Sequence, residues 1–277
     1  IRQSLVGSEM CIRDRMKAVK LITGWAKESG LVEKIEILSF VDGGSSIQWM
    51  EKAGAKTQNL LTKGSINHLK NQIKKTPTQH FKDISNVIQY AEDHGIKTNV
   101  YLEDWSNGMK NSKSYVMDMV QFLSEKTIDR ILLPDTLGVL TPNLTKEFIK
   151  DITNNYPEIH FDFHAHNDYD LSVANVIESI RNGCKGIHIT VNGMGERAGN
   201  APLASVVAVV NDFLTGYKID VNEKSLHKVS KLVSNFSGFR IPVNKPIVGD
   251  NVFTQTAGIH ADGDNKKNMY FNDLLPE

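Results

Sequence analysis

The chain has 277 residues, of which 40% are hydrophobic and 23% are charged, and its 32 basic and 32 acidic side chains give a net charge of zero. This composition is typical of a globular protein, and the lack of a basic block disfavours a nucleic-acid partner. No apolar run approaches the roughly 18 residues that span a bilayer, so no membrane association is expected. The two cysteines, Cys11 and Cys184, have neither metal-type nor redox-type spacing, which favours a reducing, cytoplasmic setting.

Residues 1–15 differ from the rest of the chain. They show no clear hydrophobic period and resemble a translated sequencing adapter, so they are interpreted as an artefactual leader that takes no part in the fold. A helix is expected to begin near Met16, because apolar side chains recur at helical spacing through residues 17–27.

Beyond this helix, strand and helix patterns alternate along the chain. Short, β-branched, apolar runs predict strands at residues 34–41, 56–62, 96–102, 130–133, 159–164 and 186–191. Amphipathic patterns predict helices at residues 45–53, 78–94, 112–126, 145–156, 171–182 and 201–214. This alternation indicates βαβ units and therefore a parallel sheet.

Two α/β architectures are compatible with six strands. One is a (β/α)8 TIM barrel truncated by the loss of its first two strands, and the other is an open doubly wound sheet. Polar residues follow the C-terminal ends of at least four strands, as in barrel active sites, whereas an open sheet binds its ligand at one switch point. The predicted fold is therefore the truncated barrel over residues 16–214. Residues 215–277, with a helix expected at 223–235, are predicted to begin a post-barrel subdomain of helix and loop.

The most informative motif is the H-x-H pair of His164 and His166 at the end of a predicted strand. Side chains two residues apart on a strand share a face, so both imidazoles can reach one ion. Imidazole suits Zn, Mn, Fe or Co, although an H-x-H pair alone is also common as a plain surface pair. Asp168 and Asp170 follow the pair and are expected to cap the next helix.

Other candidates lie after neighbouring strands. Tyr101 and Glu103 share one strand face, and Glu103 is suited to general acid/base work, although a cap or an ion pair is the commoner role of a glutamate. Thr136 lies in a tight turn, where its hydroxyl binds either a substrate carboxylate or turn backbone. Asn200 follows a glycine-broken loop and is either a helix cap or part of a metal shell.

Three longer motifs carry a family resemblance. FDFHAHNDYDLSVAN, NGMGERAGNAPL and the tail FTQTAGIHADGDNKKNMY resemble the metal-dependent condensing enzymes of acetyl-CoA and 2-oxoacids, the group of 2-isopropylmalate, homocitrate and citramalate synthases. The likeness runs from about Lys17 to the last residue. Within the family, NVYLEDWSNGMKNS and LLPDTLGVLTP are most similar to bacterial (R)-citramalate synthases.

The resemblance implies a Claisen-type acyl transfer in which a divalent metal (Mn, Zn, Mg or Co) polarises the keto group of the 2-oxoacid. Pyruvate, giving (R)-citramalate for isoleucine biosynthesis, is the first expectation. The second is 2-oxoisovalerate, giving 2-isopropylmalate for leucine biosynthesis. The family also implies a homodimer of the full-length protein.

By carry-over, each candidate residue receives a role. His164, His166 and Asn200 would hold the metal, and Thr136 would hold the substrate carboxylate. Glu103 would serve the proton transfers together with the tail residues, His260 and Tyr270.

Substrate choice is expected to follow the size of one pocket. Leu38, Leu61 and Tyr101 match the citramalate-type pocket, which accommodates the methyl group of pyruvate and crowds an isopropyl group. Asp262 and Tyr270 belong to a segment that, in the family, reaches the acetyl-CoA side of a partner subunit's site.

The sequence departs from the family in lacking the first barrel strand, which should carry an Arg-Asp pair with Asp as a third metal ligand. The chain by itself is therefore expected to bind metal weakly and to turn over little. Three alternatives stay open. A hydroxymethylglutaryl-CoA-type lyase would need a cysteine in a glycine-rich loop, and a metal-dependent hydrolase would place its H-x-H pair on the first barrel strand. The third alternative is a non-catalytic metal-binding fragment.

Overall fold

The computed structural model describes residues 9–254, 257–267 and 269. The chain divides into two units that are considered separately below. The first unit contains Ile1–Thr136, Lys150–Asp162 and Cys184–Gly186. The second unit contains Leu137–Ile149, Phe163–Gly183 and Ile187–Glu277.

All six predicted strands are present. They are β1 (Glu36–Phe40), β2 (Thr57–Lys63), β3 (Lys97–Glu103), β4 (Arg130–Asp135), β5 (Phe161–Ala165) and β6 (Gly186–His188). They form one sheet in the order β1-β2-β3-β4-β5-β6, and β1 to β4 pair in parallel. Sequential order and parallel pairing are the topology of a TIM barrel, and the structure corresponds to six of its eight strands. The strand predicted at 186–191 is shorter than expected, because residues 191–193 form a 3-10 turn, η2.

The two faces of the sheet in the first unit differ in polarity. The face covered by helices buries Leu60, Val100 and Ile131 completely, together with a hydrogen-bonded row of uncharged polar side chains, Ser39, Gln58 and Thr98. The other, inner face carries polar side chains at the same heights in neighbouring strands, because β2 and β3 pair Asn59 with Asn99 and Lys63 with Glu103. Since the side-chain period of a strand is two, one register assigns every residue of these strands to a face.

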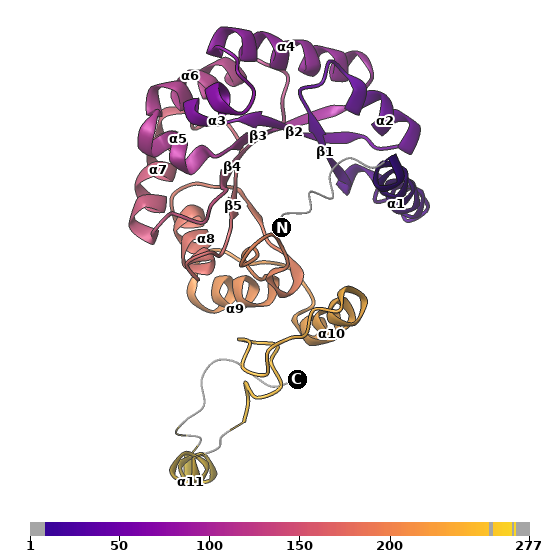
Figure 1. Cartoon of the computed structure of the whole chain (residues 1–277). Coiled ribbons are helices and arrows are strands. Elements are labelled where there is room, and N and C mark those ends of the chain that lie inside the picture. Colours follow the sequence, from indigo (N-terminus) through magenta and orange to yellow (C-terminus); the bar gives the residue numbers. More distant parts are fainter. Residues whose placement is uncertain (1–8, 255–256, 268, 270–277) are drawn as a thin grey trace. The chain divides into compact units, whose positions relative to one another are not determined.

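The sheet of the first unit is curved, and one ion pair shows it. Arg130 at the start of β4 pairs with Glu36 at the start of β1, although β2 and β3 lie between them. Three strand spacings of about 4.8 Å would place β1 and β4 roughly 14 Å apart in a flat sheet. Curvature toward the inner face brings the two side chains together, and Figure 1 shows β1 to β4 following an arc. Together with the sequential strand order, this favours a curved, barrel-type sheet over a flat open one in the first unit.

Helices cover the outer face of the arc (Figure 1). In the first unit they are α1 (Glu9–Glu28), α2 (Ser45–Ala53), α3 (Ile66–Asn71), α4 (Pro77–Asp93), α5 (Trp105–Asn111) and α6 (Lys113–Ser124). The start of α4 is set by a capping box, in which Thr76 and Gln79 satisfy each other's backbone N–H groups. The short helices α3 and α5 were not predicted. The expectation that α1 begins near Met16 was wrong, because the helix begins at Glu9.

The second unit holds the remaining helices. α7 (Pro142–Asn155) starts in it and ends in the first unit, and α8 (Ser172–Arg181), α9 (Leu203–Phe213), α10 (Leu226–Ser237) and α11 (Gly258–Lys267) follow. α10 corresponds to the helix predicted at 223–235. Within the described residues, no helix combines the length and the apolar character needed to cross a bilayer.

Candidate active site

In the first unit, the carboxyl ends of β2 and β3 carry an ion pair. Lys63 and Glu103 end the two strands at matching register, and the Lys63 ammonium contacts Glu103 Oε2. Lys63 is only 8% exposed, so its ammonium needs a nearby countercharge. Glu103 therefore lies where a base was predicted, on the inner face at a strand end, and it is held by a residue that the sequence argument did not consider.

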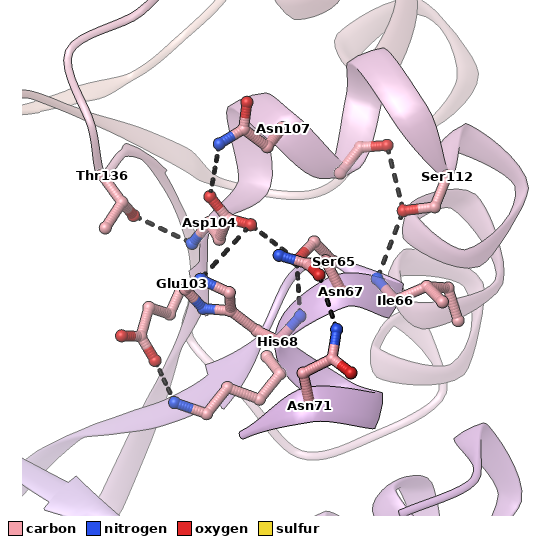
Figure 2. A network of polar contacts seen from close by, with 12 residues as sticks. Ser65, Ile66, Asn67, His68, Asn71, Glu103, Asp104, Asn107, Ser112 and Thr136 are labelled. Atoms are coloured by element: carbon pink, nitrogen blue, oxygen red, sulfur yellow. Dashed lines mark hydrogen bonds and ion pairs between the residues drawn. The ribbon is translucent and has the colours of Figure 1, made fainter. Parts of the chain in front are cut away.

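Next to this pair, Asp104 organises a second polar network (Figure 2). Asp104 is 1% exposed and has a left-handed backbone, with φ of 65°. Its carboxylate accepts hydrogen bonds from Ser65 Oγ (2.6 Å) and Asn107 Nδ2 (2.8 Å). Its N–H donates to Thr136 Oγ1 at 2.8 Å, which holds the Thr136 side chain at the end of β4. Thr136 is thus fixed beside the end of β3.

A polar cavity of about 790 Å3 adjoins the same network. It is lined by Asp104 together with hydroxyl, amide and ammonium groups from α3 and from the starts of α5 and α6, among them Ser65, Asn107 and Lys70. The carboxyl ends of β2 and β3 therefore present a hollowed polar surface in place of a closed apolar core.

The residues predicted to line the substrate pocket all lie on the inner face of the first unit. Leu61 and Tyr101 are partners in the register of β2 and β3, and the β1 residue at their height is Phe40. Leu38 lies one inward-facing position earlier on β1, beside Asn59. Burial raises the pKa of the Tyr101 phenol, so this side chain stays neutral at any physiological pH.

In the second unit, the two predicted metal ligands face each other. The Nε2 atoms of His164 and His166 are 3.4 Å apart, and the ring centroids are separated by 5.0 Å. Burial, with smaller contributions from His188 and His166, lowers the pKa of His164 to about 3, so its imidazole is neutral, as a ligand must be. The His188 ring lies 5.6 Å from that of His164.

The separation of the two nitrogens fits a shared ion. Two nitrogens bound at about 2.1 Å in a tetrahedral site lie about 3.4 Å apart, and in an octahedral site about 3.0 Å. Among the described residues, no group of three or more His, Cys, Asp or Glu side chains is arranged to hold a metal. Any further protein donor from this part of the chain must therefore come from another residue type.

Asn200 provides such a donor. It pairs with His166 in an isolated antiparallel bridge, and its Nδ2 donates to the carbonyl of Met194 at 3.0 Å. Its Oδ1 is buried and accepts no hydrogen bond within the described part of the chain, which is costly for an amide oxygen unless another group occupies its lone pairs. Asn200 does not cap a helix, because α9 begins at Leu203 with Pro202 as its cap. The donor set of two imidazoles and one amide oxygen fits a divalent ion.

Close backbone approach in the glycine loop shapes this arrangement. A Cβ on Gly195 would come within 2.5 Å of Asn200 Nδ2, and one on Gly199, where φ is 88°, would collide with the carbonyl of Gly193. Two glycines are therefore needed for Asn200 to lie beside His166.

One capping prediction was wrong. The N-cap residue of α8 is Leu171, and the first N–H of the helix is satisfied by Asn167, whose Oδ1 accepts hydrogen bonds from the N–H and Oγ of Ser172. Asp168 instead forms a bidentate ion pair with Arg197 (2.8 and 2.9 Å), and this hydrogen bonding lowers the pKa of the Asp168 carboxyl. The pair ties the loop after β5 to the glycine loop.

The tail residues are less informative. His260 and Asp262 lie on α11, where Asp262 is exposed and pairs with Lys266 one turn later at 2.5 Å. Tyr270 lies outside the described residues. The roles predicted for these three residues stay predictions.

Comparison with known proteins decides the family. The HMGL-like family profile matches residues 36–233, which is more than half of the chain. The chain belongs to the HMGL-like family.

Relatives within this family bear the names of three synthases. The chain is 39% identical over 210 residues to a probable 2-isopropylmalate synthase of Ignicoccus hospitalis, covering 76% of this chain and 52% of that protein. It is 38% identical over 199 residues to a homocitrate synthase of Sulfolobus acidocaldarius (72% and 42%). It is 33% identical over 272 residues to the (R)-citramalate synthase CimA of Methanocaldococcus jannaschii (98% and 53%). The chain thus spans about half the length of the curated relatives it matches.

Solved HMGL-like structures share the fold. A hydroxymethylglutaryl-CoA lyase from Acinetobacter baumannii, in complex with coenzyme A and 3-methylmalate, has a TM-score of 0.64 at 19% identity and covers 74% of this chain and 69% of that one. The lyase from Bacillus subtilis has a TM-score of 0.65 at 18% identity (74% and 71%). At this identity the likeness establishes the barrel fold alone.

Two residues of the inner face escaped the sequence argument. Lys63 and Phe40 lie on the same inner face as Glu103 and Leu61. Lys63 was missed because the predicted strand ended at residue 62, whereas β2 continues to Lys63, and because its partner depends on the register of β2 with β3.

Proposed function

We propose that the chain is the barrel portion of a longer, metal-dependent synthase that condenses acetyl-CoA with a 2-oxoacid. Pyruvate is the proposed acceptor, giving (R)-citramalate, and 2-oxoisovalerate is the alternative. The observation that carries the proposal is the pair of Nε2 atoms 3.4 Å apart, together with Asn200, which is bridged to His166 and has a buried amide oxygen without a hydrogen bond in the described part of the chain. The names of the relatives as 2-isopropylmalate, homocitrate and citramalate synthases support the reaction class.

In this proposal, His164, His166 and Asn200 hold the metal. When bound, the ion supplies Lewis-acid polarisation of the keto group. The neutral state of His164 supports its role, since a protonated imidazole has no lone pair to share. Thr136, held in place by the N–H of Asp104, is proposed to bind the substrate carboxylate.

Glu103 is proposed as the base that acts on acetyl-CoA. Its carboxylate takes a proton from the methyl carbon of the acetyl group, and the C–H electron pair forms the enolate of the thioester. The enolate carbon then forms a C–C bond with the keto carbon, whose oxygen becomes an alkoxide and is protonated. Water finally cleaves the thioester, releasing the CoA thiol. His260 and Tyr270 are proposed to assist these proton transfers.

The inner-face side chains support pyruvate as the acceptor. Leu61, Tyr101 and Phe40 occupy one height of the sheet and Leu38 the neighbouring one, so the first unit lines its inner face with two leucines and two aromatic rings. Each additional methylene in such an apolar pocket changes discrimination by about 1–3 kcal/mol. An isopropyl group adds two carbons to the methyl of pyruvate, which this lining disfavours.

A lyase activity is the second candidate, but no residue of this chain favours it. The glycine loop at 193–199 contains no cysteine, and Cys184 is buried before β6. Homodimerisation and a cytoplasmic location, as in a biosynthetic enzyme, belong to the same proposal.

The test is acetyl-CoA-dependent release of thiol by the longer synthase with Mn2+, comparing pyruvate and 2-oxoisovalerate. We expect a higher kcat/KM with pyruvate. A higher value with the branched acid would assign the protein to 2-isopropylmalate synthesis, no release with either acid would contradict both acceptors, and no release with any 2-oxoacid would contradict the reaction class. The 277-residue chain alone is expected to give little or no release, and a substantial rate from it would contradict the need for further strands.

A further inference from the structure

The carboxyl ends of β2 and β3 carry the Lys63–Glu103 ion pair, and neighbouring side chains hold the backbone of Lys63 in place. Lys63 pairs with Glu103 Oε2, and its side chain is about 10% exposed while that of Glu103 is 22% exposed. Such a lysine cannot lose its partner without leaving a nearly buried, uncompensated charge. The pair is therefore a constraint on the carboxylate and not an incidental surface contact, which would be worth little.

The backbone of Lys63 is held by two helices. The Lys63 N–H donates to Nε2 of His80 on α4 at 3.2 Å, and the Tyr115 hydroxyl on α6 donates to the Lys63 carbonyl at 2.8 Å. Both side chains are almost fully buried. Burial lowers the pKa of His80 to about 4 and raises that of Tyr115, so the histidine remains an acceptor and the phenol a donor near neutral pH. The position from which Lys63 reaches Glu103 is thus fixed by groups whose ionisation does not change near pH 7.

The ion pair gives the two carboxylate oxygens of Glu103 different surroundings. Oε2 is occupied by Lys63, whereas Oε1 takes part in no hydrogen bond within the described part of the chain. Figure 2 shows the Glu103 side chain turned away from the Asp104 network. The groups that bind the Asp104 carboxylate therefore do not bind the carboxylate of Glu103. A base needs a carboxylate oxygen open to the substrate proton, and this arrangement leaves Oε1 in that position.

We propose that Lys63 is the positioning residue of the base: its ammonium holds the Glu103 carboxylate in one rotamer through Oε2, with Oε1 directed to the methyl group of the acyl thioester. Lys63 itself does not contact the reacting atoms. This inference rests on the proposed function, because it assigns Glu103 to proton abstraction.

The experiment compares Lys63→Met and Lys63→Arg in the longer synthase. Methionine keeps the unbranched stem and removes the charge, whereas arginine retains the charge. We expect K63M to lower kcat about 100-fold with the KM for the 2-oxoacid changed less than threefold, and K63R to recover at least a tenth of the wild-type kcat. Lys97→Met is the matched control, since Lys97 is exposed and makes only a long ion pair with Glu33.

A kinetic isotope effect separates positioning from a general loss of structure. With methyl-trideuterated acetyl-CoA, K63M is expected to show a larger isotope effect on kcat than the wild type, because proton abstraction becomes more rate-limiting. A K63M enzyme with kcat within threefold of wild type, or with reduced kcat and an unchanged isotope effect, would overturn the proposal.

The ion pair is also tested without catalysis. Acetylation of the folded longer synthase by acetic anhydride, followed by mass spectrometry, is expected to modify Lys63 far more slowly than Lys97, and Glu103→Gln is expected to reduce this protection. Equal reactivity of Lys63 and Lys97 would overturn the pair itself. A wild-type synthase that lacks condensation would instead refute the proposed function, so the two failures are distinguishable.

Discussion

The amino and carboxyl ends of the strands in the first unit use charge in opposite ways. At the amino ends, Arg130 pairs with Glu36 and with the buried Asp162 and also donates to Asn99, so one guanidinium satisfies three neighbours. At the carboxyl ends, the Lys63–Glu103 pair leaves a carboxylate oxygen to spare and lies near a polar cavity. A network that satisfies itself stabilises the sheet, whereas groups with remaining capacity can act on a ligand. In a barrel, this is the division between a stability face and an active face.

The largest expected effect tests the proposed metal ligands of the second unit. His164→Ala in the longer synthase should reduce condensation at least 1,000-fold, because it removes one of two imidazoles that hold the proposed ion. Thermal unfolding should change little, since the site is at a strand end. Thiol release and a melting curve check this, with His227→Ala on the exposed face of α10 as the control. Retention of most of the activity would contradict the metal assignment.

The stability face is tested by Arg130→Met. The change removes the guanidinium from the carboxylate of Asp162, which is 1% exposed and whose other oxygen lies 2.9 Å from His160 Nε2, so we expect unfolding to become easier by about 3 kcal/mol. Urea denaturation measures it, and kcat below the melting transition should remain near wild type. Arg181→Met, which breaks an exposed pair with Glu178, should cost less than about 1 kcal/mol. A large loss of kcat in R130M without a loss of stability would show that the amino ends of the strands serve activity and not stability, which would contradict the comparison.

Stability should also depend on pH through His80. Burial, followed by the charge of Lys75, lowers its folded pKa to about 4 from the ordinary 6.5, so the unfolded chain binds the proton more readily. The contribution to stability is therefore complete above pH 6.5 and is lost as the pH falls toward 4, by up to about 3 kcal/mol. Urea unfolding at several pH values checks it. His80→Gln should remove this part of the dependence, and identical pH profiles for the two proteins would contradict the assignment.

A smaller effect is expected at the glycine loop. Gly195→Ala places a methyl group against Asn200 Nδ2 and should displace the amide oxygen, lowering Mn2+ affinity about tenfold. Calorimetric titration of Mn2+ measures this. Gly24→Ala is the control, since a Cβ there meets nothing within 4 Å and alanine favours the helix. Equal metal affinity in the two variants would show that Asn200 is not a ligand.

Local periodicity in the sequence was sufficient for the elements and for part of the site. Alternation of strands and helices predicted all six strands, and the i, i+2 rule placed His164 with His166 and Tyr101 with Glu103 on shared faces. These features depend on neighbours within a few residues, where the period of a strand or helix decides the outcome. The hydrogen bonding of Asn167 at the start of α8 was missed because several polar residues in one turn compete for the same N–H groups, and the backbone path selects among them.

By itself, the sequence determined a parallel α/β chain with paired imidazoles and a carboxylate at strand ends, and its motifs indicated the family. Only the tertiary structure decided which distant residues meet. Lys63 reaches Glu103 across 40 residues and Arg130 reaches Glu36 across 94, and the glycine loop returns to place Asn200 beside His166. Such contacts depend on strand register and sheet curvature, which are set by packing over the whole unit and leave no local pattern in the chain.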